Sequence, residues 1–278
     1  MTDAIDGVRD HCRASGLAQR LKAALTVFGP EEQQLTPEQL APLDQFHTRG
    51  LAATAELAEL AGIDATMAVL DIGSGLGGPA RFLAATRGCR VTGIDLSEAF
   101  VAAARYLTER AGQSGKVGFE VGSALELPFE DKHFDAVLLQ HVAMNIADRE
   151  RLYREIRRVL KPAARFATFD VVSKTGEPHY PVPWAKTPET SFLQTAEATR
   201  GLIEEAHLRT LTWRDDSELA VAWFAKLRAA GPPPSPNLGV VMGPDFAQAA
   251  ANLGRNLVED RLGILTAVFE ATPMDDKV

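Results

Sequence analysis

Two carboxylates and a run of glycines stand where the sequence predicts the ends of two neighbouring strands. Residues 67–72 are largely apolar and indicate a short buried strand, and a helix is predicted from Pro79. Residues 73–77, between them, include three glycines, which adopt backbone angles closed to other residues and leave no Cβ in the way of a ligand. Asp71 lies just inside the strand end, where its carboxylate can order the loop or reach an ammonium group.

A second acid indicates the kind of ligand. Residues 90–94 predict the next strand, and Asp95 follows at its end. In a doubly wound sheet the ends of adjacent parallel strands border one crevice, where an acid can accept two hydrogen bonds from a ribose diol. The predicted ligand is therefore a nucleoside. Spacing alone leaves its identity open, because residues 73–78 also satisfy the Gly-x-Gly-x-x-Gly pattern of NAD enzymes.

Segments further along the chain favour one of these alternatives. The turn, with its acid before the first glycine, resembles the first motif of the class I S-adenosylmethionine-dependent methyltransferases. Residues 122–129, 134–141 and 157–162 resemble the next three motifs of that family, in the family's order. The resemblance covers residues 45–213 closely and the remainder loosely. It implies a methyltransferase with S-adenosyl-L-methionine as cofactor, and an NAD-dependent oxidoreductase is the alternative from a different class.

The resemblance also implies roles for particular residues. The implied cofactor-binding residues are Arg49, Asp71, Gly73, Gly75, Gly77, Asp95, Leu96, Ser123, Ala124, Leu125 and Gln140. In this interpretation Asp95 binds the ribose hydroxyls, Leu96 covers one face of the adenine, and Gln140 presents its carbonyl to the cofactor's ammonium group. Many family members have Asp where this chain has Ser123, whose hydroxyl has no charge and less reach. Adenine recognition is therefore expected to depend on the next two backbone N–H groups.

One histidine is the candidate catalytic residue. Methyl transfer from a sulfonium is an in-line displacement, for which the protein mainly has to align the acceptor. If the acceptor carries a proton, a base must remove it, and His141 stands at the carboxyl end of a central predicted strand. A structural histidine is the alternative. No metal site is predicted.

Six further residues are candidates for contact with the acceptor: Phe46, His47, Met144, Asn145, Tyr180 and Trp184. The segment that contains His47 resembles one that lies over cofactor and acceptor in small-molecule methyltransferases, and the alternative is a helix cap with this histidine half exposed. Tyr180 and Trp184 belong to a proline-spaced segment that forms a hydrophobic lid, faces a cationic amine, or is a packed surface loop.

The acceptor is predicted to be a small molecule. Residues 45–50 and 243–248 are similar in layout to glycine, sarcosine and dimethylglycine N-methyltransferases, which implies a small amine and N-methylation. The alternative is O- or C-methylation of a phenolic, isoprenoid or quinone-precursor acceptor. The formal net charge of −8 argues against nucleic acid as the main partner, because binding to its backbone needs a basic surface.

No apolar run is long enough to span a membrane, and the N-terminus has no pattern of a signal peptide, so a cytoplasmic protein without membrane partners is expected. Cys12 and Cys89 have no metal-ligand spacing and are expected to be reduced. The sequence leaves the oligomeric state open.

The expected fold is α/β: a Rossmann-like, seven-stranded, mostly parallel sheet with helices on both faces. The strands are predicted at 67–72, 90–94, 117–121, 135–140, 164–171, 207–213 and 262–270, and the resemblance implies that the last is antiparallel beside the fifth. Helices are predicted near 51–60, 79–87, 97–113, 148–160, 192–206, 215–230 and 245–259.

The expected organisation is an N-terminal helical cap, 1–62, and a methyltransferase domain, 63–278, with a lid segment at 173–191 and a helical insertion at 215–260. Two local features are also predicted. Residues 215–218 are a candidate capping box for the helix that follows. Residues 161–165 carry two alanines where family members usually have glycines, so this turn is expected to be of another type or strained by about 1 kcal/mol or more.

Overall fold

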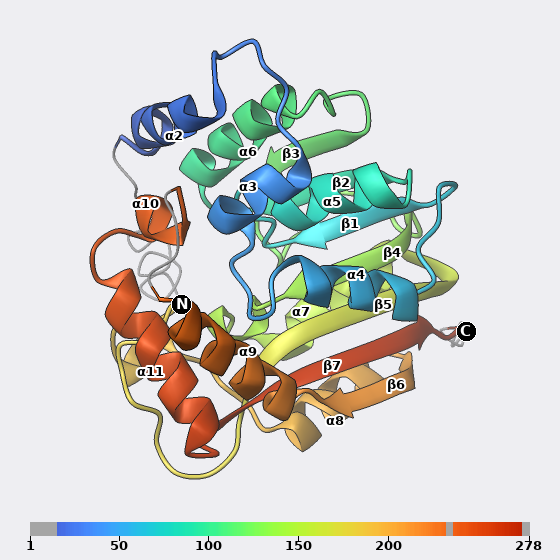
Figure 1. Ribbon diagram of the computed structural model, residues 1–278. Coiled ribbons are helices and arrows are strands. Elements are labelled where there is room, and N and C mark those ends of the chain that lie inside the picture. Colours follow the sequence, from blue (N-terminus) through green and yellow to red (C-terminus); the bar gives the residue numbers. More distant parts are fainter. Residues whose placement is uncertain (1–15, 232–235, 274–278) are drawn as a thin grey trace.

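One seven-stranded sheet runs through the computed structural model, which describes residues 16–231 and 236–273 (Figure 1). The strands are β1 (Ala68–Ile72), β2 (Arg90–Asp95), β3 (Val117–Val121), β4 (Phe134–Gln140), β5 (Leu160–Ser173), β6 (Leu208–Asp215) and β7 (Leu262–Ala271). Their order is β3-β2-β1-β4-β5-β7-β6, and β7 is antiparallel to both of its neighbours. The predicted fold is confirmed, including the last strand beside the fifth.

Both faces of the sheet are covered by helices. One face packs against α4 (Leu51–Leu60), α5 (Gly78–Thr86), α6 (Glu98–Arg110), α9 (Ser217–Ala230) and α11 (Phe246–Val258). The other packs against α7 (Arg149–Val159) and α8 (Ala196–Glu205). In β1, Val69 belongs to the first core, and Leu70 and Ile72 belong to the second, as the alternation of side chains along a strand requires.

A smaller third layer covers one end of the sheet. It contains α2 (Leu17–Leu25), α3 (Pro37–Asp44) and α10 (Leu238–Met242). Helix α2 packs on α6, α3 packs on α5, and α10 packs on both α2 and α3. Figure 1 shows α2 and α10 on the same side of the molecule, although more than 200 residues separate them in the chain. Short 3-10 turns complete the structure: η1 (Thr26–Phe28), η2 (Ala143–Asn145) and η3 (Pro188–Thr190).

Helix α3 is not among the predicted helices, although its start has a clear signature. The Thr36 side chain accepts a hydrogen bond from the Gln39 backbone N–H at 3.3 Å, and the Gln39 side chain accepts one from the Thr36 backbone N–H at 2.9 Å. Pro37 occupies the first helical position. This is a complete capping box, which a Thr-x-x-Gln pattern predicts.

The capping box predicted at residues 215–218 is wrong. Helix α9 has Asp216 at its N-cap, without a side-chain cap bond. The Asp216 carboxylate is buried and instead meets Arg49 at 3.2 Å and Arg214 at 2.6 Å. Asp215 accepts from the Ser217 backbone N–H at 2.9 Å. The helix therefore begins one residue later than the pattern predicts, and its N-cap carboxylate is engaged by ion pairs with Arg49, distant in the chain, and with the neighbouring Arg214.

Several expectations concern residues outside the described ranges. Cys12 and residues 232–235 of the proline-rich segment are among them. Cys89 is a buried free thiol. Among the helices of residues 16–231 and 236–273, none is long and apolar enough to span a bilayer.

The strain expected in residues 161–165 is present at Ala163, whose φ is +60°. A left-handed conformation costs a residue with a Cβ about 1–2 kcal/mol, and the entropy that glycine adds to the unfolded chain offsets about 0.4–1 kcal/mol of that. We therefore expect Ala163→Gly to raise the free energy of unfolding by about 0.5 kcal/mol, measured by urea denaturation. Ala164→Gly, at a buried position without positive φ, is the control and should lower it. A lower midpoint in Ala163→Gly would contradict the assigned strain.

Candidate functional site

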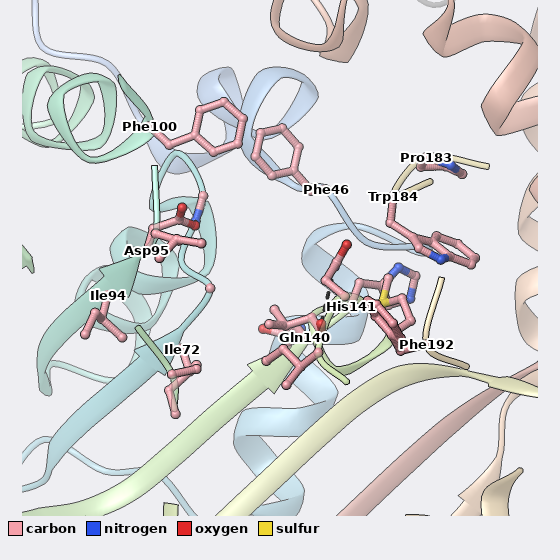
Figure 2. A pocket seen from close by; sticks show the side chains of 18 of the residues that line it. Phe46, Ile72, Ile94, Asp95, Phe100, Gln140, His141, Pro183, Trp184 and Phe192 are labelled. Carbon is pink, nitrogen blue, oxygen red and sulfur yellow. Dashed lines mark hydrogen bonds between the residues drawn. The ribbon is translucent and has the colours of Figure 1, made fainter. Parts of the chain in front are cut away.

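A cavity of about 330 Å³ opens at the carboxyl ends of the parallel strands. One half is lined by Phe46, Ile72, Gly73, Gly75, Ile94, Asp95, Leu96, Phe100, Gly122, Ser123, Ala124, Leu125 and Gln140. The side that contains His141 also has Pro183, Trp184 and Phe192 (Figure 2), and the lining is completed by Val142, Met144, Asn145, Ile146, Ala147, Asp148, Val241, Met242, Phe246 and Leu253. Figure 2 shows Asp95 and His141 on opposite sides of the cavity, with Gln140 between them.

The glycine turn is closely packed on its neighbours. Gly75 has φ +52°, and a Cβ placed there would lie 2.6 Å from the ring of Phe46. The Phe46 ring packs on that of Phe100 with centroids 5.8 Å apart, and both rings line the cavity. Gly75 therefore cannot be replaced by a residue with a side chain, and the turn requires this backbone conformation. Phe46, predicted to contact the acceptor, lies on the side of Gly75 and Asp95 (Figure 2).

Asp95 connects the turn with the second strand. Its Oδ2 accepts from the Gly75 N–H and its Oδ1 from the Ser97 N–H, each at 2.9 Å. Burial raises the pKa of this carboxyl, and the two backbone donors oppose that shift. Asp95 lines the cavity, as expected for a residue that binds ribose hydroxyls. That role stays a prediction.

Asp71 lies behind the turn and does not line the cavity. It is buried, and burial together with the nearby Asp95 carboxylate raises its pKa to about 7. Its Oδ2 and the buried Ser74 hydroxyl have no hydrogen-bond partner in the described part of the chain. Two unsatisfied polar atoms beside the turn fit a site for a polar, cationic ligand group, because buried polar atoms are otherwise almost always paired.

The loop after β3 uses one of its expected donors internally. The Leu125 N–H donates to the Ser123 Oγ at 3.1 Å, so this backbone group already has a partner. All three residues from Ser123 to Leu125 line the cavity. Of the two backbone N–H groups expected to bind the adenine edge, that of Ala124 remains as a donor. The proton of the Ser123 hydroxyl is a second donor.

His47 is a buried structural histidine and not half exposed. Its Nδ1 lies 3.1 Å from the Thr48 carbonyl oxygen, which can only accept, so Nδ1 carries the proton. Its Nε2 therefore accepts from the Thr54 hydroxyl at 3.1 Å. The same Thr54 oxygen accepts from the Gln140 side-chain amide at 3.3 Å. Burial lowers the His47 pKa to about 4, so it stays neutral and orients Gln140 from outside the cavity.

His141 lines the cavity at the end of β4 with φ +54°. Its ring stacks on Phe169 with centroids 5.3 Å apart, and its Nε2 lies 3.5 Å from the Thr48 hydroxyl. Burial and the neighbouring His47 hold its pKa well below the usual 6.5. A neutral imidazole at the wall of a cavity can accept a proton, and its lowered pKa makes it a weaker base than a free histidine.

The half of the cavity beyond His141 is apolar and closed by aromatic rings. Trp184 is fixed by its indole N–H, which donates to the Ser191 Oγ at 2.9 Å. Arg149, buried behind the wall, donates to the carbonyls of Ile146 and Phe192 at 3.0 Å each. Among the described lining residues none is Lys or Arg, and the carboxylates are those of Asp95 and Asp148.

Besides Asp71 and His47, three predicted site residues do not line the cavity. Arg49 does not line the cavity, and its guanidinium pairs with Glu56 at 2.8 Å and with Asp216. Gly77 lies behind the lining, where a Cβ would meet the Phe119 ring. Tyr180 packs against the core, and Pro183 and Trp184 of the same segment line the cavity.

Sequence reasoning missed several apolar lining residues, chiefly Phe100, Phe192, Met242 and Phe246. Phe100 was detectable, because it follows the second acid by about one helical turn and would lie beside it at the start of α6. Met242 and Phe246 come from α10 and α11, which reach the cavity only through the packing of those helices on the N-terminal layer and the core. No local signal marks them.

Comparisons with known proteins agree with this geometry. Residues 70–168 match the family model described as a methyltransferase domain. The sterol 24-C-methyltransferase ERG6B of Gibberella zeae is 40% identical over 114 residues, which are 41% of this chain and 30% of that protein. The methyltransferase GfsG of Streptomyces halstedii is 33% identical over 130 residues, 47% of each chain. The chain thus spans less than half the length of these curated relatives.

Solved structures share the fold. The phosphoethanolamine N-methyltransferase 2 of Haemonchus contortus, in complex with S-adenosyl-L-methionine, has a TM-score of 0.71 at 18% identity, over 96% of this chain and 60% of that one. The geranyl diphosphate C-methyltransferase of Streptomyces coelicolor, with S-adenosyl-L-homocysteine, has a TM-score of 0.65 at 18% identity, over 80% and 78%. The 4+2 cyclase SpnF has a TM-score of 0.66 at 24% identity, over 87% and 99%.

The packing of the glycine turn leads to a direct prediction. Gly75→Val is expected to abolish measurable binding of S-adenosylhomocysteine, because the branched side chain would clash with the Phe46 ring at a position of positive φ. Gly118→Val is the matched control, since a Cβ there meets nothing within 4 Å. Both are titrated by calorimetry after circular dichroism has shown that they fold. Normal binding by a folded Gly75→Val protein would remove the turn from the cofactor site.

Proposed function

Since this chain contains a class I S-adenosylmethionine-dependent methyltransferase domain, we propose that it methylates a small, uncharged and largely apolar acceptor. The observation that carries the proposal is the cavity itself. Its first half has the glycine turn and Asp95, and its second half is apolar and aromatic, with one neutral imidazole between the apolar wall and Gln140.

The residues of the first half would hold the cofactor. Asp95 is suited to the ribose hydroxyls and Leu96 to a face of the adenine, and Asp71, buried behind the turn, would act on the cationic amino-acid end from outside the lining. S-adenosylmethionine, when bound, supplies a methyl group on a sulfonium sulfur. The chain's contribution is to exclude water with Phe46 and Phe100 and to fix the turn, because alignment is what an in-line displacement requires.

His141 would act on the acceptor from the opposite wall. Its unprotonated nitrogen can accept a proton from an acceptor hydroxyl or from the carbon next to the new bond. The Thr48 hydroxyl, 3.5 Å from Nε2, and the stacked Phe169 ring hold the imidazole in place. The loop that follows is held by Asp170, whose Oδ2 accepts from the Ala143 N–H at 2.8 Å.

The charge of the lining favours the alternative to the amine prediction. Glycine, sarcosine and dimethylglycine carry a carboxylate, and a buried carboxylate needs a cation or several donors. The described lining contains no Lys or Arg, so no cationic side chain there would pair with the carboxylate of such an acceptor. Transfer of an uncharged acceptor from water into such a cavity costs little desolvation free energy, and burial of its apolar surface is favourable. O- or C-methylation of a phenolic or isoprenoid compound is therefore the proposed reaction.

A screen of acceptors tests the proposed function. Release of S-adenosylhomocysteine is measured with phenols, prenylated aromatics, sterols and linear isoprenoid alcohols, and with glycine, sarcosine and dimethylglycine as the charged set. We expect turnover in the uncharged set only. Turnover confined to the amino acids would restore the amine prediction. Binding of the cofactor without turnover in any set would favour a role such as that of the cyclase, in which the fold performs other chemistry.

The base is tested by pH. The active form of His141 is neutral, so activity is present above its folded-state pKa and is lost as the pH falls through it. Because that pKa is well below 6.5, kcat/KM with an acceptor that does not itself titrate should stay level from about pH 8 to below pH 6.5. His141→Gln should lower kcat by about 100-fold or more while S-adenosylhomocysteine still binds. A wild-type kcat in the variant would make His141 structural, and a midpoint at or above pH 6.5 would contradict its lowered pKa.

A further inference from the structure

A fully buried ion pair joins the segment that carries Phe46 to the glycine turn. Arg81 is 0% exposed, and its Nη2 lies 2.6 Å from the Asp44 Oδ2 at the end of α3. The same Nη2 donates to the Leu76 carbonyl at 2.6 Å, inside the turn. One guanidinium therefore holds α3 and the turn together.

The second arm of the guanidinium, Nη1, is fixed by α6, and its Nε has no hydrogen-bond partner among the described residues. Nη1 of Arg81 donates to the Ala104 carbonyl at 3.2 Å and to the Thr108 hydroxyl at 3.0 Å. The donors of a guanidinium form a rigid planar fork, so partners on α6 determine where the other arm points. A lysine ammonium at the same place cannot reach both α3 and α6 with this geometry. The contacts of Arg81 thus join α3, α5, α6 and the turn.

There is no space for α3 to settle differently against the turn. A Cβ on Gly78 would lie 2.5 Å from both the Asp44 Oδ1 and the Gln45 Nε2. Two residues after Asp44, the Phe46 ring covers Gly75. A displacement of Asp44 would therefore carry Phe46 away from the turn and widen the part of the cavity next to Asp95.

We propose that Asp44 and Arg81 are positioning residues for the cofactor: their ion pair holds Phe46 and the glycine turn in the one arrangement that receives the nucleoside. The identity of the nucleoside rests on the proposed function, whereas the coupling of α3 to the turn rests on the contacts alone. Removing one partner of a buried ion pair leaves an uncompensated charge. Asp44→Asn leaves the guanidinium charge uncompensated, and Arg81→Lys keeps the charge but loses the fork that spans α3 and α6, so each change is expected to loosen both segments together.

The test compares Arg81→Lys and Asp44→Asn with Arg157→Lys. Arg157 is a matched control because it is also buried and also donates to a main-chain carbonyl, that of Thr272. Thr272 follows β7. Because β7 is antiparallel to β5, the C-terminal end of β7 lies at the opposite end of the strands from the cavity. Arg81→Lys keeps the positive charge in the core and is the deciding variant if Asp44→Asn does not fold.

Two readouts are measured on the folded proteins: calorimetric titration with S-adenosylhomocysteine, and hydrogen exchange of peptides covering residues 36–46 and 73–78. We expect Arg81→Lys and Asp44→Asn to bind at least about tenfold more weakly and to exchange faster in both peptides. Arg157→Lys should match the wild type in both readouts, even if its melting temperature falls. A purely structural role would lower the melting temperatures and leave the dissociation constants unchanged.

The outcomes separate this inference from the proposed function. If the wild type binds S-adenosylhomocysteine and both variants bind it equally well, the inference is overturned and the proposed function stands. If the wild type does not bind it, the proposed function fails and hydrogen exchange decides the inference. Faster exchange in both peptides would then support the coupling, and faster exchange in only one of them would overturn it.

Discussion

The site depends on how closely a backbone turn can approach the side chains around it. The chain turns from β1 into α5 through Gly73, Gly75 and Gly77. The side chains of Val142, Phe46 and Phe119, respectively, pack against these glycines. Asp95 holds this turn from the second strand through the Gly75 N–H. A Cβ at any of the three positions would displace an aromatic ring or a branched side chain, so the shape of the cavity's first half follows from this packing.

Charge has a comparable effect on the second half. The cations near the cavity are engaged elsewhere: Arg81 with Asp44, Arg49 with Asp216 and Glu56, and Arg149 with carbonyls of the wall. Their guanidinium groups brace the scaffold, and the lining in the described residues is left with two carboxylates and a neutral imidazole. Such a wall suits a cationic cofactor and an uncharged acceptor, because neither leaves an anion without a partner.

The sequence predicted what strand ends and local spacing determine. Asp95 and the glycines meet because parallel strands end at one edge, and β7 lies where the family resemblance placed it. Tertiary choices were not predictable in this way. The carboxylate of Asp216 pairs with Arg49 from a distant segment and with the nearby Arg214 and so does not cap its helix, and His47 is buried by contacts with Thr54 and Gln140. Met242 and Phe246 reach the cavity only through the packing of α10 and α11.

The central claim is that the cavity at the carboxyl ends of β1, β2 and β4 binds S-adenosylmethionine through Asp95 and the glycine turn. Calorimetric titration of the wild type and of Asp95→Ala with S-adenosylhomocysteine and with NADH tests it most directly. The account predicts one sulfur nucleoside bound per chain, no binding of NADH, and a loss of about 1.5–3 kcal/mol in the folded variant. Tight binding of NADH with none of S-adenosylhomocysteine, or an unchanged dissociation constant in Asp95→Ala, would contradict it.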